Sequence, residues 1–144
     1  KKFIANYIKV LGKHKVVYGG TKYTKRKPRS EQKMLHWKYG HKRERKPVEK
    51  RNKDIHASFR SNNFIIDRDL FLDIRFDEDV EMYGHEDTLF AQDLKDQKVA
   101  IYHVDNPVIH GGLEKADVYL NKVEESILNL IKLKKAGRHL ENST

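Results

Sequence analysis

Apolar residues recur at helical spacing in three stretches of the chain. The stretch 3–11 carries an apolar stripe and is followed by Gly12, which predicts a short helix closed by a glycine. The stretches 86–97 and 118–131 show the same spacing, and Gly137 follows the last of them. We therefore expect a helix near each end of the chain and a third in its second half.

Stretches that carry apolar residues without the helical period predict strands over 16–18, 57–66, 99–104 and 107–110. Strands that alternate with helices indicate the α/β fold class. No internal repeat is present in the sequence. We expect residues 1–136 to form one domain and residues 137–144 to be a frayed tail.

Two shorter helices are expected between these elements. Pro28 and Gly40 bracket a helix over 31–39. Asp67 is placed to cap a short helix, and the acid-rich stretch 73–84 predicts a loop.

The composition excludes several classes of protein. The 144 residues include no cysteine, which rules out disulfides and cysteine-ligated metals and suits a reducing compartment. No apolar run approaches the roughly 20 residues that a membrane-spanning helix requires, and no secretory signal pattern opens the sequence. The well-separated apolar clusters indicate a globular domain instead.

The net charge of +9 comes from one segment. Residues 22–53 hold 14 Lys or Arg against three Glu, a net charge of +11, so the other 112 residues sum to −2. This concentration indicates a local anionic partner such as a diphosphate, anionic lipid headgroups or nucleic acid. A solvated charged loop is the commoner role of such a segment.

Two adjacent carboxylates, Glu86 and Asp87, follow Gly84 and His85 and open the helix expected over 86–97. The positive end of the helix dipole favours the ionised form of both acids. A general base requires an ionised carboxylate that is held in a fixed position, as the first turn of a helix can hold it. Acids in the first turn of a helix are also ordinary capping chemistry, and this alternative stays open.

An ordered series of segments resembles the second half of a family-2 glycosyltransferase. The segments are Val16-Val17-Tyr18-Gly19-Gly20, the string 35–40, Ser61-Asn62-Asn63-Phe64 with the rest of 61–71, Phe76-Asp77-Glu78, Tyr83-Gly84-His85-Glu86-Asp87, and Asn106-Pro107-Val108-Ile109-His110. The match covers most of residues 1–135. Its order makes it more specific than any single motif.

The resemblance implies a partial GT-A fold (nucleotide-diphospho-sugar transferase-like), its C-terminal half. In that family a carboxylate removes a proton from an acceptor hydroxyl, which attacks the anomeric carbon with inversion. The resemblance assigns this role to Asp87, with Glu86 orienting the acceptor or sharing the role. The nucleotide-binding half and its Asp-x-Asp metal motif are expected upstream of residue 1. The chain is then a C-terminal fragment, inactive by itself.

The resemblance also implies a divalent metal, Mn²⁺ or Mg²⁺, with His110 as a third ligand beside the upstream Asp-x-Asp pair. Imidazole suits Mn²⁺ better than Mg²⁺, which prefers oxygen ligands. A hydrogen-bonded, buried histidine is the structural alternative for His110. The triplets 67–69 and 77–79 also read Asp-x-Asp, but we interpret the first as a helix cap and the second as a solvated loop.

The candidate substrate-binding residues combine backbone freedom, amide groups and an aromatic ring: Gly19, Gly20, Trp37, Asn62, Asn63, Gly84 and His85. Asparagine amides can grip sugar hydroxyls, but asparagines are also ordinary turn formers. A flat aromatic ring such as Trp37 or Tyr39 can cover a sugar face, although packing of a helix onto the core is the commoner role. His85 has a second interpretation as a turn residue.

The sequence thus predicts a glycosyltransferase fragment that moves a sugar from a nucleotide-sugar donor to a glycan or lipid-linked acceptor in polysaccharide biosynthesis. We expect a cytoplasmic location, with residues 22–53 suited to peripheral contact with the anionic inner face of a membrane. The alternative is a basic nucleic-acid-binding module, which the mixture of cations with Trp37 and Tyr39 favours. Nucleic acid is the less favoured partner because the acids over 67–87 would repel a phosphate backbone.

Overall fold

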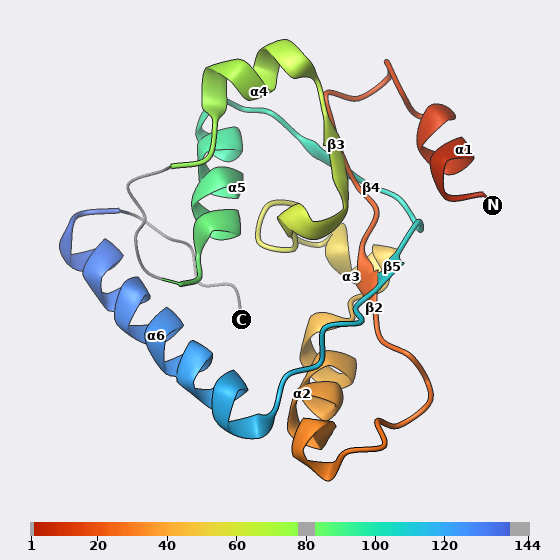
Figure 1. The fold of residues 1–144 in the computed structure, drawn as a ribbon. Helices are drawn as coiled ribbons and strands as arrows, with labels where there is room; N and C mark the ends of the chain where they lie inside the picture. The colour runs from red at the N-terminus through yellow and green to blue at the C-terminus, as the bar shows by residue number, and fades with distance from the viewer. Residues whose placement is uncertain (1, 78–82, 139–144) are drawn as a thin grey trace.

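A computed structural model describes residues 2–77 and 83–138 of the protein and shows a mixed α/β fold (Figure 1). The helical elements are α1 (Phe3–Ile8), η1 (Glu31–Lys33), α2 (Met34–Tyr39), η2 (Gly40–Glu44), α3 (Val48–Arg51), η3 (Ser61–Asn63), α4 (Arg68–Ile74), α5 (Glu86–Asp96) and α6 (Ala116–Lys135). The strands are β1 (Val16–Tyr18), β2 (Thr21–Lys22), β3 (Phe64–Ile66), β4 (Ile101–His103) and β5 (Val108–Ile109).

The larger sheet has the order β3-β1-β4, with β3 antiparallel and β4 parallel to β1. Val16 lies opposite Ile66 on one side and Ile101 on the other. All three residues of β1 are buried, as expected for a central strand without a solvent face. The predicted strand over 16–18 is therefore confirmed.

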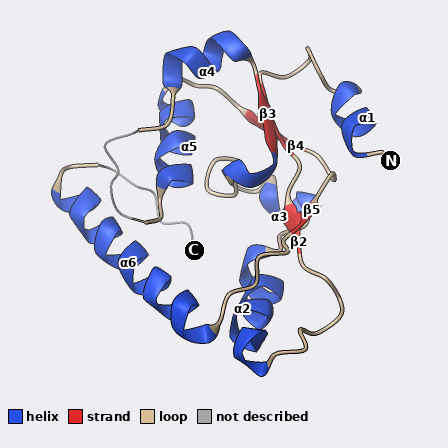
Figure 2. Ribbon diagram, in the orientation of Figure 1, coloured by secondary structure: helices blue, strands red, loops and turns tan. Residues whose placement is uncertain are grey.

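A second, two-stranded sheet continues from the first (Figure 2). Its strands β2 and β5 run parallel, with Thr21 opposite Val108. Gly19 and Gly20 connect β1 to β2, and the chain passes from β4 to β5 beside them. The two paths stay in register because the Asn106 N–H donates to the Gly19 carbonyl at 3.1 Å and the Val108 N–H to the Gly20 carbonyl at 3.1 Å.

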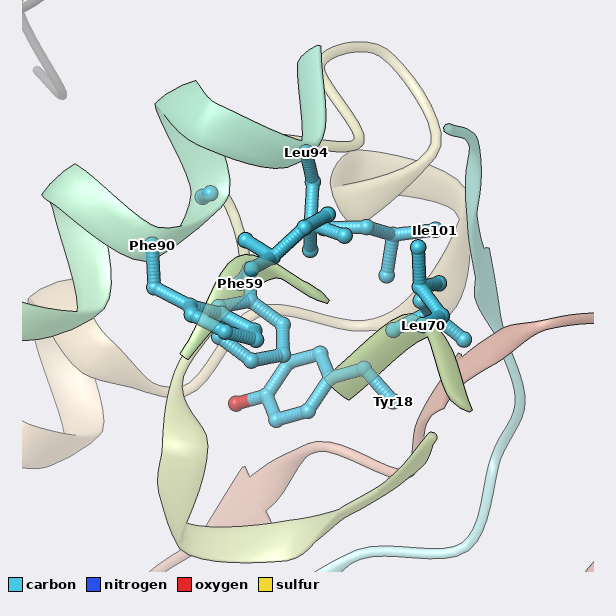
Figure 3. Packing of buried hydrophobic residues seen from close by; sticks show 9 residues of the cluster. Tyr18, Phe59, Leu70, Phe90, Leu94 and Ile101 are labelled. Carbon is cyan, nitrogen blue, oxygen red and sulfur yellow. The ribbon is translucent and has the colours of Figure 1, made fainter. Parts of the chain in front are cut away.

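The hydrophobic core lies between the larger sheet and the helices α4 and α5, where Figure 3 shows the labelled side chains converging. Phe59, Phe90 and Leu94 are at most 1% exposed. The ring of Phe76 stacks on that of Phe90 with 4.3 Å between centroids. Each fully buried side chain of this size stabilises the fold by about 1.5–3 kcal/mol, so this cluster holds α5 against the sheet.

Several predicted elements are confirmed. The helix expected over 86–97 is α5, and the last helix is α6, which ends shortly before Gly137. Asp67 caps α4, since its Oδ1 accepts a hydrogen bond of 3.0 Å from the Leu70 N–H. Residues 139–144 of the predicted tail and 78–82 of the predicted loop lie outside the described residues.

The strand predicted over 57–66 was too long. Only Phe64–Ile66 pair with β1. The preceding backbone bonds locally, with the Phe59 N–H donating to the His56 carbonyl at 3.1 Å. The Ser61 N–H donates instead to the carboxylate of Asp87 at 3.1 Å. The N–H groups of Phe59 and Ser61 therefore do not pair with β1, and η3 forms where the strand was predicted.

The helix predicted to stop at Gly40 continues into the π-helical turn η2. Gly40 is needed there for close approach, because a Cβ at this position would lie 2.2 Å from the ring of Tyr23. The first predicted helix is shorter than expected, since α1 ends at Ile8 and turns lead on to Gly12. No helix of the described ranges is both long and apolar enough to cross a membrane.

Candidate functional site

A groove of about 480 Å³ collects residues from six separate parts of the chain. The residues that line it are Tyr18, Thr21, Glu44, Arg60, Asn62, Tyr83, Gly84, His85, Glu86, Asp87, Thr88, His110 and Ser126. Six of the sequence-predicted site residues are among them: both candidate catalytic acids, the candidate metal ligand, and Asn62, Gly84 and His85. The fold thus brings these candidates to one surface.

The two acids have different surroundings. Asp87 is half-buried, and its Oδ1 accepts a hydrogen bond of 3.1 Å from the Ser61 N–H. Glu86 is exposed, and its Oε1 accepts from the N–H of Gly84 at 3.2 Å within its own turn. Both stand in the first turn of α5, where the helix dipole favours a negative charge. Asp87 is the more rigidly held carboxylate, since its partner belongs to another element.

The turn before the acids has an unusual backbone. Gly84 has a φ of +92° and His85 a φ of +75°, both in the left-handed region. A Cβ at Gly84 would lie 2.7 Å from Ser126 Oγ, so only glycine fits against α6 there. His85 is a non-glycine residue in this region, which costs on the order of 1 kcal/mol.

Helix α6 holds this turn from the side. Asn129 is buried, and its Nδ2 donates to the Gly84 carbonyl at 2.6 Å. The ring Nε2 of His85 lies 3.1 Å from both the carbonyl oxygen and the Oγ of Ser126. Sequence reasoning missed Ser126 and Asn129. No local signal marked them, because Ser126 and Asn129 share their helix face with the charged Lys122 and lie beside the apolar stripe.

His110 lies in a cluster of rings at the other end of the groove. Its ring is 5.2 Å from that of Tyr23 and 5.3 Å from that of His36, between centroids. Burial lowers the pKa of His36, whose Nδ1 accepts a hydrogen bond of 3.1 Å from the Glu114 N–H. The Nδ1 of His110 is buried without a hydrogen-bond partner within the ranges 2–77 and 83–138.

An unpartnered imidazole nitrogen is compatible with a metal ligand, and His110 fits that role to this extent. In the described part of the chain, no three His, Cys, Asp or Glu side chains converge as a metal site. Asp67 caps a helix, and Asp77 pairs with Arg138 at 2.6 Å, so neither acts as a ligand here. Asp79 lies outside the described residues.

Asn62 and Asn63 are neighbours with opposite surroundings. Asn62 is exposed in the groove, where its amide bonds the Oγ1 of Thr21. Asn63 is only 6% exposed and does not line the groove. Its Oδ1 accepts from the Tyr7 hydroxyl at 2.7 Å, and its Nδ2 donates to the carbonyls of Gly20 and Asn106. Asn62 is therefore placed for substrate, whereas the Asn63 amide is engaged within the protein.

Gly19 and Gly20 are tightly enclosed by the protein itself. A Cβ at Gly19 would lie 2.4 Å from the Tyr7 hydroxyl and 2.5 Å from Asn63 Nδ2. A Cβ at Gly20 would lie 2.9 Å from the guanidinium carbon of Arg51. These glycines lie behind the groove rather than in its lining and permit the close packing that brings β2 beside β5.

Trp37 also lies outside the groove lining. Its Nε1 donates to the Thr24 carbonyl at 2.9 Å, and its ring packs against His41 with 4.5 Å between centroids. Trp37 thus fastens α2 to the loop before it. Of the uncharged side chains that do line the groove, Tyr18 is the most deeply set, and burial raises the pKa of its hydroxyl.

Comparison of the chain with protein-family models, with curated proteins and with solved structures gave no match.

Proposed function

We propose that the groove is the acceptor side of an inverting family-2 glycosyltransferase of the GT-A fold, with Asp87 as the catalytic base. The observation that carries the proposal is the convergence of Asn62, the acid pair and His110 on one groove. They come from three separate segments of the chain, and local sequence pattern alone gives no reason for them to meet. A cleft with a few convergent polar groups is the usual form of a substrate site.

In this proposal the acceptor hydroxyl lies against Asp87 and donates a hydrogen bond to its second carboxylate oxygen, Oδ2. Asp87 takes the proton as the hydroxyl oxygen bonds to the anomeric carbon and the bond to the nucleoside diphosphate breaks. The hydrogen bond from Ser61 keeps the carboxylate in one orientation during this step. Asn62 and Glu86 border the same groove and are placed to hold neighbouring acceptor hydroxyls.

His110 would be one ligand of a divalent ion in this site, through the nitrogen that is unpartnered in the described structure. When bound, such an ion neutralises charge on the departing diphosphate. The proposed donor is a nucleotide sugar and the proposed acceptor a glycan or lipid-linked glycan.

The test is a sugar-transfer assay on the complete gene product, with a panel of nucleotide sugars and detection of the released nucleoside diphosphate. Asp87→Asn should lower the transfer rate at least ~100-fold, the low end for loss of a general base. Asp117→Asn is the matched control, because Asp117 is an exposed acid in the first turn of α6. An equal effect of both substitutions, or none at Asp87, contradicts the assignment.

A further inference from the structure

The basic segment does not spread its charge evenly over the surface. Part of it, η2 and α3 with the loop between them, forms one wall of a pocket of about 800 Å³. Eight Lys and Arg side chains line this pocket, against a single carboxylate, that of Glu44. A concave surface with this excess of cations concentrates positive potential at one point.

The innermost cation of the pocket is Arg51, which is 3% exposed. Its guanidinium donates to the carbonyls of Tyr18 at 3.2 Å and Val104 at 2.9 Å, and its Nε has no hydrogen-bond partner in the described structure. It forms no ion pair with any carboxylate of the described ranges. Burying a charge without a counter-charge is costly, so a buried guanidinium in this state is suited to an anion supplied from outside.

The side chain beside Arg51 is kept neutral. His103 Nδ1 lies 3.3 Å from the Arg51 guanidinium, and its Nε2 lies 2.9 Å from the Ile55 carbonyl. Burial lowers the pKa of His103 to about 4. A neutral imidazole accepts a hydrogen bond from Arg51 and adds no negative charge, so His103 does not neutralise the guanidinium.

We propose that this pocket binds the diphosphate group of a substrate. A diphosphate carries several negative charges in a compact volume, and its oxygens match the fork of a guanidinium. The concave shape favours a compact anion over the flat surface of a membrane, which cannot enter a pocket. The ligand's source is either a nucleoside diphosphate or a polyprenyl diphosphate carrier.

The pocket adjoins the groove that holds Asp87. Tyr18, Thr21, Glu44 and Arg60 line both. A diphosphate in the pocket would therefore lie next to the groove, with the sugar attached to it directed towards the acids. This placement rests on the proposed function, whereas binding of a diphosphate does not.

The test compares two triple substitutions that each remove two lysines and one arginine from the basic segment. K42Q/R43Q/K46Q changes pocket-lining residues. K25Q/R26Q/K27Q changes exposed residues that do not line the pocket. Arg51 is left intact because it holds main-chain carbonyls. Calorimetry on the complete gene product measures the affinities for inorganic pyrophosphate, for uridine diphosphate and for farnesyl diphosphate.

We expect K42Q/R43Q/K46Q, the pocket triple, to weaken pyrophosphate binding at least tenfold. K25Q/R26Q/K27Q, the control triple, should weaken it less than threefold. A matching loss for farnesyl diphosphate alone assigns the pocket to a lipid carrier, and a loss for uridine diphosphate alone assigns it to a nucleotide. Equal losses in both triples, or none in either, overturn the proposal. So does a single-stranded oligonucleotide that binds more tightly than pyrophosphate and loses more affinity in the pocket triple.

The result is separable from that of the transfer assay. Asp87→Asn should leave pyrophosphate affinity unchanged, since Asp87 does not line the pocket. Pocket-dependent pyrophosphate binding without any sugar transfer would refute the proposed function and keep the pocket. Sugar transfer that depends on Asp87, with pyrophosphate affinity unchanged by K42Q/R43Q/K46Q, would support the proposed function and refute diphosphate binding in the pocket.

Discussion

Substitution of the two neighbouring asparagines by alanine should have very different effects on stability. Asn63 is buried and makes three side-chain hydrogen bonds, to Tyr7, Gly20 and Asn106. Asn62 is exposed, and its side chain bonds the Thr21 hydroxyl as its one partner among residues 2–77 and 83–138. The same substitution at the two positions thus compares a buried network with a solvated contact, one residue apart.

The loss of stability in Asn63→Ala depends on which hydrogen bonds the former partners of the Asn63 side chain retain. The Tyr7 hydroxyl still has the Asn63 carbonyl at 3.0 Å, and the Gly20 carbonyl still has the Val108 N–H. The carbonyl of Asn106 loses its side-chain donor. One buried carbonyl deprived of its donor costs about 1–3 kcal/mol, and the two other lost bonds about 1 kcal/mol each. We expect a loss of about 3–5 kcal/mol in the free energy of unfolding, against at most about 0.5 kcal/mol for Asn62→Ala.

Urea unfolding followed by circular dichroism measures both values. Asn63→Asp adds a check on the mechanism, because an ionised carboxylate cannot donate to the two carbonyls. Burial should raise the pKa of that carboxyl above its unfolded value, so the stability of Asn63→Asp should recover as the pH falls through the raised pKa. If Asn63→Ala lowers the free energy of unfolding no more than Asn62→Ala does, the hydrogen bonds of Asn63 to Tyr7, Gly20 and Asn106 do not stabilise the fold as described.

Three further predictions concern His103, Gly84 and His110. Because the pKa of His103 is lowered to about 4 in the folded protein, its contribution to stability is complete above the unfolded pKa of about 6.5 and is lost as the pH falls towards 4. We expect about 3 kcal/mol of pH-dependent stability in this window, measured by urea unfolding, and a flatter profile in His103→Gln. Gly84→Ala should lower the free energy of unfolding more than Gly137→Ala in the same assay. Both positions have positive φ, but a Cβ at Gly84 would lie 2.7 Å from Ser126, whereas the described residues leave the space around Gly137 open. His110→Ala should weaken Mn²⁺ binding in a titration of the complete gene product and leave acceptor binding intact; an unchanged titration would assign His110 to packing against Tyr23.

The elements that the sequence predicted well are those with strong local signals. The helix α5 has a regular apolar stripe, and its buried residues Leu89, Phe90 and Leu94 are the ones that the spacing selects. The cap at Asp67 depends on a hydrogen bond to a residue three positions away. Both are decided within a single turn or face of a helix, where pattern and physics coincide.

The elements predicted poorly are decided by distant contacts. The residues before β3 were assigned to one strand with the apolar Phe64–Ile66 that follows them, yet the Ser61 N–H bonds a carboxylate 26 positions away. Gly40 was expected to end a helix, but its role is to admit the Tyr23 ring. Nothing in the local pattern distinguishes Asn62 from Asn63 either, because the difference arises from Tyr7 and Asn106.

The same reasoning explains why the acid pair could be found from sequence and its support could not. Glu86 and Asp87 are visible as a motif, but their orientation depends on a left-handed His85 that is unfavourable by itself. The contact of His85 with Ser126, 41 positions away, and that of Gly84 with Asn129, 45 positions away, offset that cost. One hydrogen bond contributes about 1 kcal/mol, comparable to the strain it opposes. The geometry of the acids is therefore set by α6, and their placement is a property of the folded chain rather than of the motif.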